Sequence, residues 1–408
     1  MGKPTIRFEG YTDDWEQRKL SEISDVRDGT HDSPSYLSDG HPFVTSKNVK
    51  DGYINYDDVQ YISDEDFEAI NKRSKVDMND ILMGMIGTIG NLALIRTEPD
   101  FAIKNVALIK DTKQVSYMYL YHYLQSSSAE RQLLSGLDGG TQKFVSLKNI
   151  RELNIMVPSE AEQLKVGNFI ESLDHLITLH HRKCEETKKL KKFMLQKMFP
   201  KKGEKVPDIR FDGFTDDWEQ RKLGELGSLK NGMNFSKEAM GIGFPFVNLQ
   251  NIFGNNVIDV TNLGKAMASD SQLKDYNLLN GDVLFVRSSV KLEGVGEAAL
   301  VPQNLENTTY SGFIIRFRDE YGLDNNFKRF LFGIESVRNQ IMAQATNSAN
   351  KNISQTVLEN LCLKIPNKSE QEKIGLYFSD IDHLITLHQH KCEELQNIKK
   401  FMLQNMFT

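Results

Sequence analysis

The sequence predicts an α+β protein made of two similar bodies, each followed by one long α-helix. Three observations lead to this fold class. The chain has 408 residues, which is too long for one ordinary hydrophobic core. It contains two pairs of nearly identical segments, one pair at the start and one at the end of two successive halves. Each half ends in a run of about 40 residues with helical periodicity.

The repeated segments define the two halves. Residues 6–20 read IRFEGYTDDWEQRKL and residues 209–223 read IRFDGFTDDWEQRKL. The second pair is DHLITLHHRKCEE from Asp174 and DHLITLHQHKCEE from Asp382, running on into KKFMLQKMF and KKFMLQNMF. The sequence between the matched ends hardly corresponds. The two halves should therefore have similar folds with nearly identical ends and different surfaces. The identical ends indicate one type of partner or connection used twice, and the different surfaces indicate two different binding partners.

Each long helix has a recognisable start. Ser159–Glu162 follows Pro158 and matches a capping box, with Ser159 capping and Glu162 reaching back; Asn367–Glu370 follows Pro366 in the same way. Beyond these starts, apolar or neutral residues recur at three- and four-residue steps and form one helix face: Leu173, Ile177, His180, Cys184, Thr187, Leu190, Met194 and Met198. A helix of this length spans roughly 60 Å, so we expect it to pack on another long helix, most obviously its own repeat.

The two bodies, roughly 20–157 and 223–365, read as α+β domains. Short β-branched and aromatic runs alternate with Gly, Asn and Asp turns, for example YINYDDVQYI, NVALIKD, DVLFVRSS and GFIIRFR. Helical stretches are expected at Tyr119–Leu134 and Asn326–Ala345. Each body has a comfortable size for a single core.

Composition narrows the class of protein. Hydrophobic residues make up 39% and charged residues 26%, as in soluble globular proteins. No apolar stretch approaches the roughly 18 residues that span a bilayer, Met1–Pro4 is followed by no apolar signal segment, and three cysteines are too few for a disulfide scaffold. We therefore predict a cytoplasmic protein that contacts no membrane. The net charge of -6 neither indicates nor excludes a nucleic-acid partner, because phosphate contacts need only a local basic face.

Catalytic motifs are missing. The chain has no P-loop, no dinucleotide fingerprint at Gly84, Gly87 and Gly90, and no Asn-Pro-Pro-aromatic methyltransferase tetrapeptide. Pro99–Asp100 with Asp111–Lys113 resembles a split nuclease metal site, but the second half has no counterpart and a chance match is the better interpretation. We predict no catalytic residue.

Two helical features have a structural and a binding interpretation. His180 with Cys184, and His388 with Cys392, are spaced to offer four zinc ligands, but the surrounding leucines favour a helix–helix seam, so no metal site is predicted. The basic run from Arg182 to Lys202 is typical of a solvated helix face; contact with phosphates or an acidic partner is the alternative.

The duplicated arrangement resembles the specificity subunit of type I restriction–modification systems. Two variable domains, each followed by a long repeated helix, with TDDWEQRKL opening both halves, match that layout. Local phrases agree, including Arg27–Pro34 and Pro42–Val44 in the first body, and Asn231–Gly232 with Pro245–Asn248 in the second. The resemblance covers essentially the whole chain.

The resemblance implies a non-catalytic DNA-recognition subunit. The family's layout gives two pseudo-symmetric α/β target-recognition domains separated by two antiparallel helices that form a coiled coil. On this sequence the parts would be 1–158 (first domain), 159–202 (first helix), 203–366 (second domain) and 367–408 (second helix). Each domain would recognise one half of a split, asymmetric double-stranded target, and the helices would set the gap. Two methyltransferase subunits and motor–nuclease subunits would be partners, and S-adenosylmethionine, ATP and Mg²⁺ would bind to them rather than to this chain.

By this analogy, DNA contacts are expected from polar loops of the bodies, because Arg, Lys, Asn and Gln read base edges or hold phosphates. The candidates are Thr30, His31, Lys47, Asn48, Thr141, Gln142, Lys143, Asn248, Gln250, Arg287, Ser288, Ser289, Asn350 and Lys351. Candidates for packing, partner docking or the coiled coil are Trp15, Trp218, Leu173, Ile177, His180, Cys184, Ile381, Ile385, His388 and Cys392.

Two other functions stay open on the sequence alone. One is a duplicated-domain DNA nuclease or methyltransferase that acts by itself. The other is a two-armed adaptor that binds two protein ligands.

Overall fold

The computed structural model describes residues 4–50, 52–139, 143–346 and 348–407. The chain divides into two compact units, which we call unit 1 (Met1–His181 with Gln389–Thr408) and unit 2 (Arg182–His388). Both dividing points lie inside the long helices. Each unit therefore contains one body together with segments of both helices.

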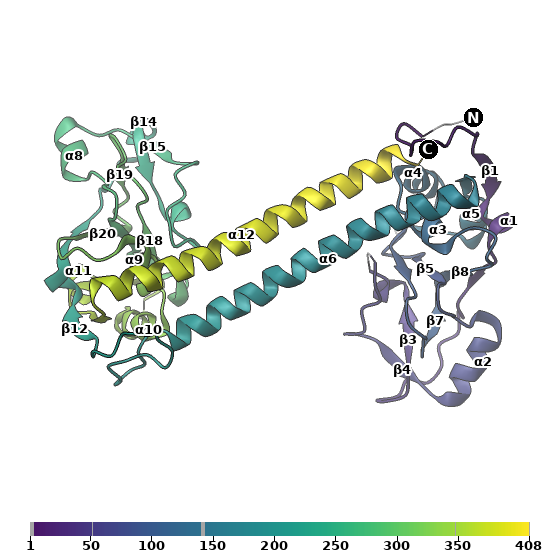
Figure 1. Ribbon diagram of the computed structural model, residues 1–408, viewed down its shortest axis with the longest axis horizontal. Helices are drawn as coiled ribbons and strands as arrows, with labels where there is room; N and C mark the ends of the chain where they lie inside the picture. Colours follow the sequence, from purple (N-terminus) through teal and green to yellow (C-terminus); the bar gives the residue numbers. More distant parts are fainter. Residues whose placement is uncertain (1–3, 51, 140–142, 347, 408) are drawn as a thin grey trace. The chain divides into compact units, whose positions relative to one another are not determined.

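The body of unit 1 is built mainly on antiparallel strand pairs, while β3 pairs with β7 in parallel (Figure 1). A four-stranded sheet has the order β2-β8-β5-β6, a three-stranded sheet has the order β4-β3-β7, and β1 pairs with β11. Its strands are β1 (Glu16–Lys19), β2 (Val26–Asp28), β3 (His41–Thr45), β4 (Gln60–Ile62), β5 (Ile81–Gly84), β6 (Leu92–Leu94), β7 (Ala102–Lys104), β8 (Val106–Ile109), β9 (Leu137–Asp138), β10 (Phe144–Val145) and β11 (Asn154–Val157). Its helices are α1 (Leu20–Ile23), η1 (Ser46–Asn48), α2 (Asp64–Ser74), α3 (Tyr117–Leu124), α4 (Ser127–Ser135) and α5 (Leu147–Arg151).

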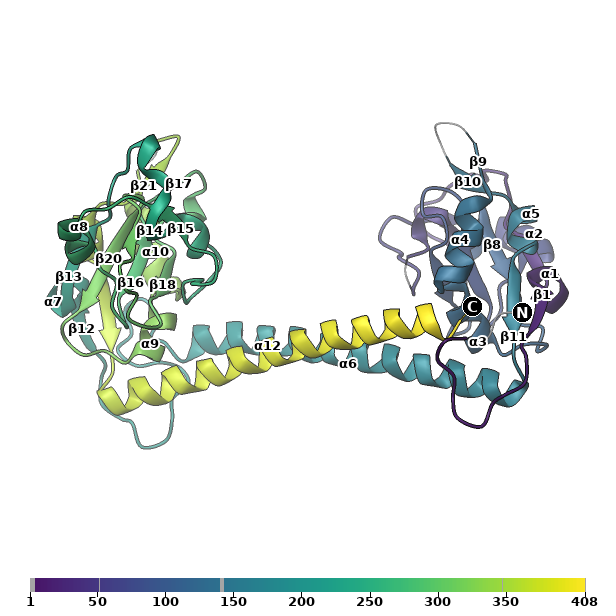
Figure 2. The same cartoon turned by 90° about the horizontal axis from the view of Figure 1, so that it is seen from above.

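Unit 2 repeats this topology (Figure 2). Its sheets have the orders β13-β20-β16-β18 and β15-β14-β19, with β12 paired to β22 and β17 to β21. The strands are β12 (Glu219–Lys222), β13 (Gly227–Asn231), β14 (Met240–Val247), β15 (Gly264–Ala266), β16 (Val283–Val286), β17 (Ser288–Ser289), β18 (Ala298–Leu300), β19 (Thr309–Tyr310), β20 (Ile314–Asp319), β21 (Lys351–Asn352) and β22 (Cys362–Ile365). The helices are α7 (Leu223–Leu226), η2 (Lys237–Ala239), η3 (Leu249–Asn251), α8 (Asp270–Asp275), η4 (Leu292–Gly294), α9 (Asn325–Leu331), α10 (Glu335–Gln344) and α11 (Gln355–Glu359).

The two long helices are confirmed as α6 (Glu160–Lys197) and α12 (Lys368–Asn405). They run antiparallel in each unit. In unit 1, Lys399 Nζ lies 2.7 Å from Asp174 Oδ1 and Cys392 Sγ lies 3.7 Å from the Ile177 carbonyl. In unit 2, Lys191 pairs with Asp382 and Cys184 Sγ lies 4.0 Å from the Ile385 carbonyl. The expected helix–helix seam is thus present in both units.

Four local predictions were wrong. Glu162 does not complete a capping box, because its carboxylate binds Arg7 and Trp15. Leu190 lies outside the seam with 47% of its surface exposed. The stretch Tyr119–Leu134 is two helices, because α3 ends at Leu124 and Ser126 caps α4 by accepting the Ala129 N–H. The stretch Asn326–Ala345 is also two helices, α9 and α10, with residues 332–334 between them.

A large hydrophobic core in each unit joins the body to the helices. In unit 1 it includes Ile170 and Leu173 of α6 and Met406 and Phe407 just beyond α12. In unit 2 it includes Phe378 and Ile381 of α12 and Phe199 just beyond α6. None of the helices in the described part of the chain combines the length and the hydrophobicity that a membrane span needs.

Candidate nucleic-acid interface

In unit 1 the predicted Lys47 and Asn48 lie on the short helix η1, directly after β3. Lys47 is exposed. Asn48 is buried: its Oδ1 accepts the Thr45 N–H at 2.9 Å and its Nδ2 donates to the Asn55 carbonyl at 3.1 Å. The amide of Asn48 therefore holds the turn together and is not presented to solvent, which corrects its assignment as a DNA contact.

Thr30 and His31 meet the turn between β7 and β8. Thr30 forms a parallel bridge with Lys104. The exposed ring of His31 lies 2.7 Å from Asn105 Oδ1 through Nδ1 and 2.9 Å from Asp28 Oδ2 through Nε2. Asn105 has a positive φ of 51° and forms the one-residue connection of the two strands. The fold thus places a histidine and an amide side by side at the surface.

Hydrogen bonds join this turn to η1. Ser46 Oγ donates to the Asn105 carbonyl at 2.5 Å and accepts the Met85 N–H at 3.0 Å. Thr30, His31 and Lys47 are therefore gathered around Asn105 at one surface of the body. Lys104 and Asn105 belong to this surface but were not predicted, because nothing in the sequence marks a one-residue connection between two strands.

The third predicted loop of unit 1 belongs to the hairpin β9–β10. Thr141 and Gln142 lie outside the described residues. Lys143, directly before β10, is exposed, and its Nζ donates to the Gly139 carbonyl at 3.2 Å. Phe144 bridges Ile86, next to Met85, so this hairpin adjoins the surface around Asn105.

In unit 2 the predicted Asn248 directly precedes the equivalent turn η3, and the predicted Gln250 lies within it. Asn248 is half-buried and its Oδ1 accepts the Leu249 N–H at 2.8 Å, whereas Gln250 is exposed. The buried role of Asn48 is taken by Asn251, whose Oδ1 accepts the Asn248 N–H at 2.9 Å. Gln250 therefore stands where unit 1 has Lys47.

The remaining candidates of unit 2 gather on the two-stranded ribbon β17–β21 (Figure 2). Ser288 pairs with Asn352, and Ser289 pairs with Lys351. Arg287 precedes β17 directly, accepts the Ile353 N–H at 2.9 Å and donates from Nη1 to the Gly312 carbonyl at 3.3 Å. Asn350 is exposed and its carbonyl accepts from Asn352 Nδ2. Two cations, two hydroxyls and an amide thus come together, as polar contacts to DNA require.

The two tryptophans lie in the cores rather than on either polar surface. Trp15 is 4% exposed, and its Nε1 donates to Glu162 Oε2 at 3.2 Å. Trp218 is 3% exposed and packs edge-on against Phe199, with ring centroids 5.9 Å apart. Both positions fit a packing role.

Each repeated segment is also tied to the start of a long helix by an ion pair. Arg7 donates to both carboxylate oxygens of Glu162 at 2.7 and 2.8 Å, and Arg210 binds Glu370 at the same distances. The repeated segments therefore form matching joints between body and helix in the two units.

The residues of the helix seam lie where the periodicity predicted. Leu173, Cys184 and Ile381 are buried, while Ile177, His180, Ile385, His388 and Cys392 are half-buried. Several lysines of the basic run pair with carboxylates: Lys188 with Glu185, Lys191 with Asp382, and Lys197 and Lys201 with Asp208. These pairs favour the interpretation of the run as a solvated helix face.

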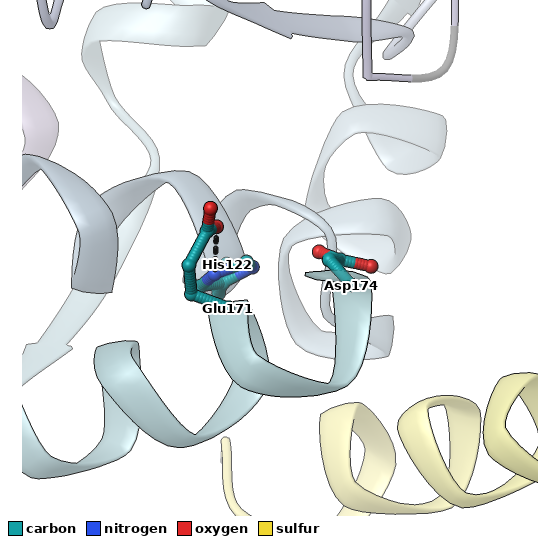
Figure 3. Close-up of side chains that lie close together, drawn as sticks. All are labelled: His122, Glu171 and Asp174. Atoms are coloured by element: carbon teal, nitrogen blue, oxygen red, sulfur yellow. Dashed lines mark ion pairs between the residues drawn. The ribbon is translucent and has the colours of Figure 1, made fainter. Parts of the chain in front are cut away.

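One group in the described part of the chain has the composition of a metal site: His122, Glu171 and Asp174, with potential ligand atoms within 4.8 Å of one another (Figure 3). Both carboxylates already have cationic partners. Arg96 binds Glu171 at 2.7 and 3.0 Å, and Lys399 binds Asp174 at 2.7 Å. A divalent ion would add positive charge to a site that is already neutralised, so the arrangement supports an ion-pair network.

The environment of this network shifts two pKa values. Contact with His122, 3.6 Å away, and the ion pair with Arg96 lower the pKa of the Glu171 carboxyl to about 2. Burial lowers the pKa of His122, which has no accessible surface. Its ring nitrogens have no hydrogen-bond partner among the described residues. The network fixes the Lys399 segment of α12 to α6 and to the body.

Comparison with known proteins decides the family. The family model described as "Type I restriction modification DNA specificity domain" matches residues 12–189 and again residues 215–397. The chain belongs to this type I specificity family. The two matches coincide with the two halves of the internal repeat, and the family's fold, two repeated specificity domains with long helices, is the predicted one.

Relatives agree along nearly the whole chain. The putative type I restriction enzyme MjaX specificity subunit of Methanocaldococcus jannaschii is 24% identical, over 97% of this chain and 93% of the relative. The EcoKI specificity subunit of Escherichia coli is 22% identical over 83% of this chain and 75% of the relative. The crystal structure of the type I S subunit from M. genitalium superposes with a TM-score of 0.61 at 13% identity, covering 100% of this chain and 99% of that one. The chain is thus a type I restriction–modification specificity protein with two target-recognition domains.

Proposed function

We propose that this chain reads a bipartite, asymmetric DNA target, one half-site for each unit, and directs adenine methylation or cleavage by partner subunits. The strongest support is a contrast between the two units: the ion pair that joins the body to a long helix is the same in both, whereas the polar surface of the body differs. Arg7–Glu162 and Arg210–Glu370 are the same joint made twice, with matching distances. The polar surfaces differ: His31 with Asn105 in unit 1, and Arg287 with the β17–β21 ribbon in unit 2.

Unlike surfaces imply unlike half-sites. An amide can read adenine, and a guanidinium can read guanine, through pairs of hydrogen bonds. Lys47, Lys104 and Lys143 in unit 1, and Arg287 and Lys351 in unit 2, supply local positive charge for phosphates although the whole chain is net -6. The two long helices would act as the spacer between half-sites.

The partners in this proposal are two methyltransferase subunits and the restriction subunits that complete such complexes, all in the cytoplasm. S-adenosylmethionine, ATP and Mg²⁺ would bind to those partners. The chain itself would be non-catalytic, so purified chain alone should neither cut nor methylate plasmid DNA. Cleavage or methylation by the chain alone would favour the rival self-contained enzyme.

The experiment that tests the proposal is a map of methylated adenines in cells that express the chain with its methyltransferase partner. The expected result is one motif with two unlike half-sites separated by unspecified bases. A palindromic or uninterrupted motif would contradict it. Failure of the complex to bind DNA in a steeply salt-dependent manner would favour a protein adaptor instead.

A further inference from the structure

The strands β19 and β20 of unit 2 are connected by one more residue than the equivalent strands of unit 1. Parallel pairing aligns the two bodies, because Val44 lies opposite Ile103 in unit 1 and Val247 lies opposite Tyr310 in unit 2. Two residues, Lys104 and Asn105, separate Ile103 from Val106, the first residue of β8. Three residues (311–313) separate Tyr310 from the first residue of β20. The extra residue is Phe313.

Phe313 places an aromatic ring in solvent. Its surface is 58% exposed, although removing a phenylalanine side chain from water is ordinarily favourable. The nearby Val290, which follows β17 directly, is 77% exposed. Both side chains adjoin polar residues of the ribbon, Phe313 through its backbone bond to Arg287 and Val290 through Ser289, so a partner that contacts the ribbon would also cover them.

The backbone around Phe313 is fixed. Its N–H donates to Ser311 Oγ at 3.3 Å and its carbonyl accepts the Arg287 N–H at 2.7 Å. Gly312 donates to the Met233 carbonyl at 2.6 Å, and a Cβ on Gly312 would lie only 2.1 Å from Asn234 Oδ1. The ring therefore projects from a rigid turn rather than from a mobile loop.

The chemistry beside the ring is that of a base reader. The Arg287 guanidinium donates a hydrogen bond to the carbonyl of Gly312, the residue before Phe313. The paired residues Ser289 and Lys351 continue the same ribbon. In the major groove, apolar side chains contact the C5 methyl group of thymine, while arginine and lysine bind guanine or phosphate.

We infer that Phe313 is a specificity-determining residue of unit 2 that contacts the C5 methyl group of a thymine in its half-site. This inference rests on the proposed function and adds a base preference to it. Unit 1 has no equivalent residue, since its shorter connection ends in Asn105. The apolar contact should therefore affect one half-site only.

The test measures binding of the full chain, in complex with the methyltransferase subunit, to duplexes carrying the mapped target. Each thymine in turn is replaced by uracil, which lacks the C5 methyl group. The wild type should bind about three- to fivefold more weakly for one thymine in the half-site read by unit 2, the effect of one methyl group leaving an apolar contact. Phe313→Ala should bind the thymine and uracil duplexes equally.

Tyr321→Ala is the matched control, because Tyr321 is also exposed, at 46%, and lies beyond the other end of β20. It should keep the wild-type preference for thymine. The inference is overturned if no uracil replacement in that half-site changes wild-type binding, or if Phe313→Ala keeps the preference. Loss of sequence-specific binding by the wild-type complex would instead overturn the proposed function.

Discussion

The carboxylates of Glu162 and Glu370 show how single residues join body to helix. Their side chains are 1% and 0% exposed, and each accepts two N–H groups from an arginine of the repeated segment. A buried carboxylate that loses its cation is strongly destabilising, whereas removing both partners costs much less. The joint therefore depends on the pair rather than on either residue alone.

We expect Arg7→Met to lower the free energy of unfolding of unit 1 by about 3 kcal/mol, because it leaves Glu162 buried and unpaired. The double variant Arg7→Met/Glu162→Met should recover most of this loss. Urea unfolding followed by fluorescence measures it, in a Trp218→Phe background where Trp15 is the remaining tryptophan of the sequence. A double variant as unstable as the single one would show that the pair contributes net stability.

His122 should make the stability of unit 1 depend on pH. Its pKa is lowered in the folded state by burial, so the unfolded chain binds a proton at a higher pH than the folded chain does. Stability should therefore fall by about 1 to 2 kcal/mol between pH 7 and pH 5, below the ordinary histidine pKa of about 6.5. The Glu171 carboxyl affects stability at lower pH. Because its pKa in the folded state is about 2, its contribution to the stability of unit 1 is lost only as the pH falls below about 4.5.

His122→Phe should remove the pH-dependent loss, because unit 2 has Phe330 at the corresponding position of the repeat. Urea unfolding at several pH values between 5 and 7.5 measures the slope. The exposed His175→Gln is the control and should keep the wild-type slope. An unchanged slope in His122→Phe would refute the assignment to His122.

At the scale of elements, a buried phenylalanine just beyond the end of each long helix packs into the core of a unit. Phe407 is 2% exposed and its ring lies 5.6 Å from those of Tyr119 and Tyr123. Phe199 lies 5.7 Å from Phe327 in unit 2. Each of these two phenylalanine side chains fills space in a core that would otherwise be a cavity.

Phe407→Ala should cost about 3 to 5 kcal/mol of unfolding free energy in unit 1, the usual range for a buried phenylalanine. Phe401→Ala is the control, since Phe401 lies in the last turns of α12 and is 51% exposed, and it should change stability by about 0.5 kcal/mol or less. Unfolding followed by Trp15 fluorescence distinguishes the two. Equal effects of the two variants on stability would contradict the packing role of Phe407.

The long helices could be predicted from the sequence, but the tertiary contacts that they make could not. Periodicity over about 40 residues predicts α6 and α12, because a repeated apolar face has few alternative structures. The capping box at Ser159 was wrong because Glu162 is taken by tertiary partners, Arg7 and Trp15, that local sequence does not reveal. The break at Ser126 was missed because Ser is tolerated inside a helical pattern and also caps one.

At the scale of the whole molecule, the internal repeat was enough to indicate the family, which the two matches to its model then showed. The composition of the units was not predictable. Cutting the chain in sequence order assigns the second helix to the second half, whereas Gln389–Thr408 belongs to unit 1. The DNA-contact residues stay predictions: Arg287 and Lys351 lie at the β17–β21 ribbon, whereas the Asn48 amide is used inside its own turn. Phe313 was not among the candidates, because an exposed phenylalanine has no sequence signal.

Lengthening the long helices should change the target. If they act as the spacer, insertion of one helical turn should widen the gap between half-sites, because each residue adds about 1.5 Å of helix. Methylation mapping of the variant measures the gap. A gap that stays the same would contradict the spacer role, while altered half-sites would show that the insertion disturbed the bodies.

The most direct test of bipartite reading is to replace residues 223–365 with the second body of another family member and map methylated adenines with the same methyltransferase partner. Independent units predict that one half-site changes while the other, and its methylation, stay the same. A change in both half-sites, or in neither, would contradict the account.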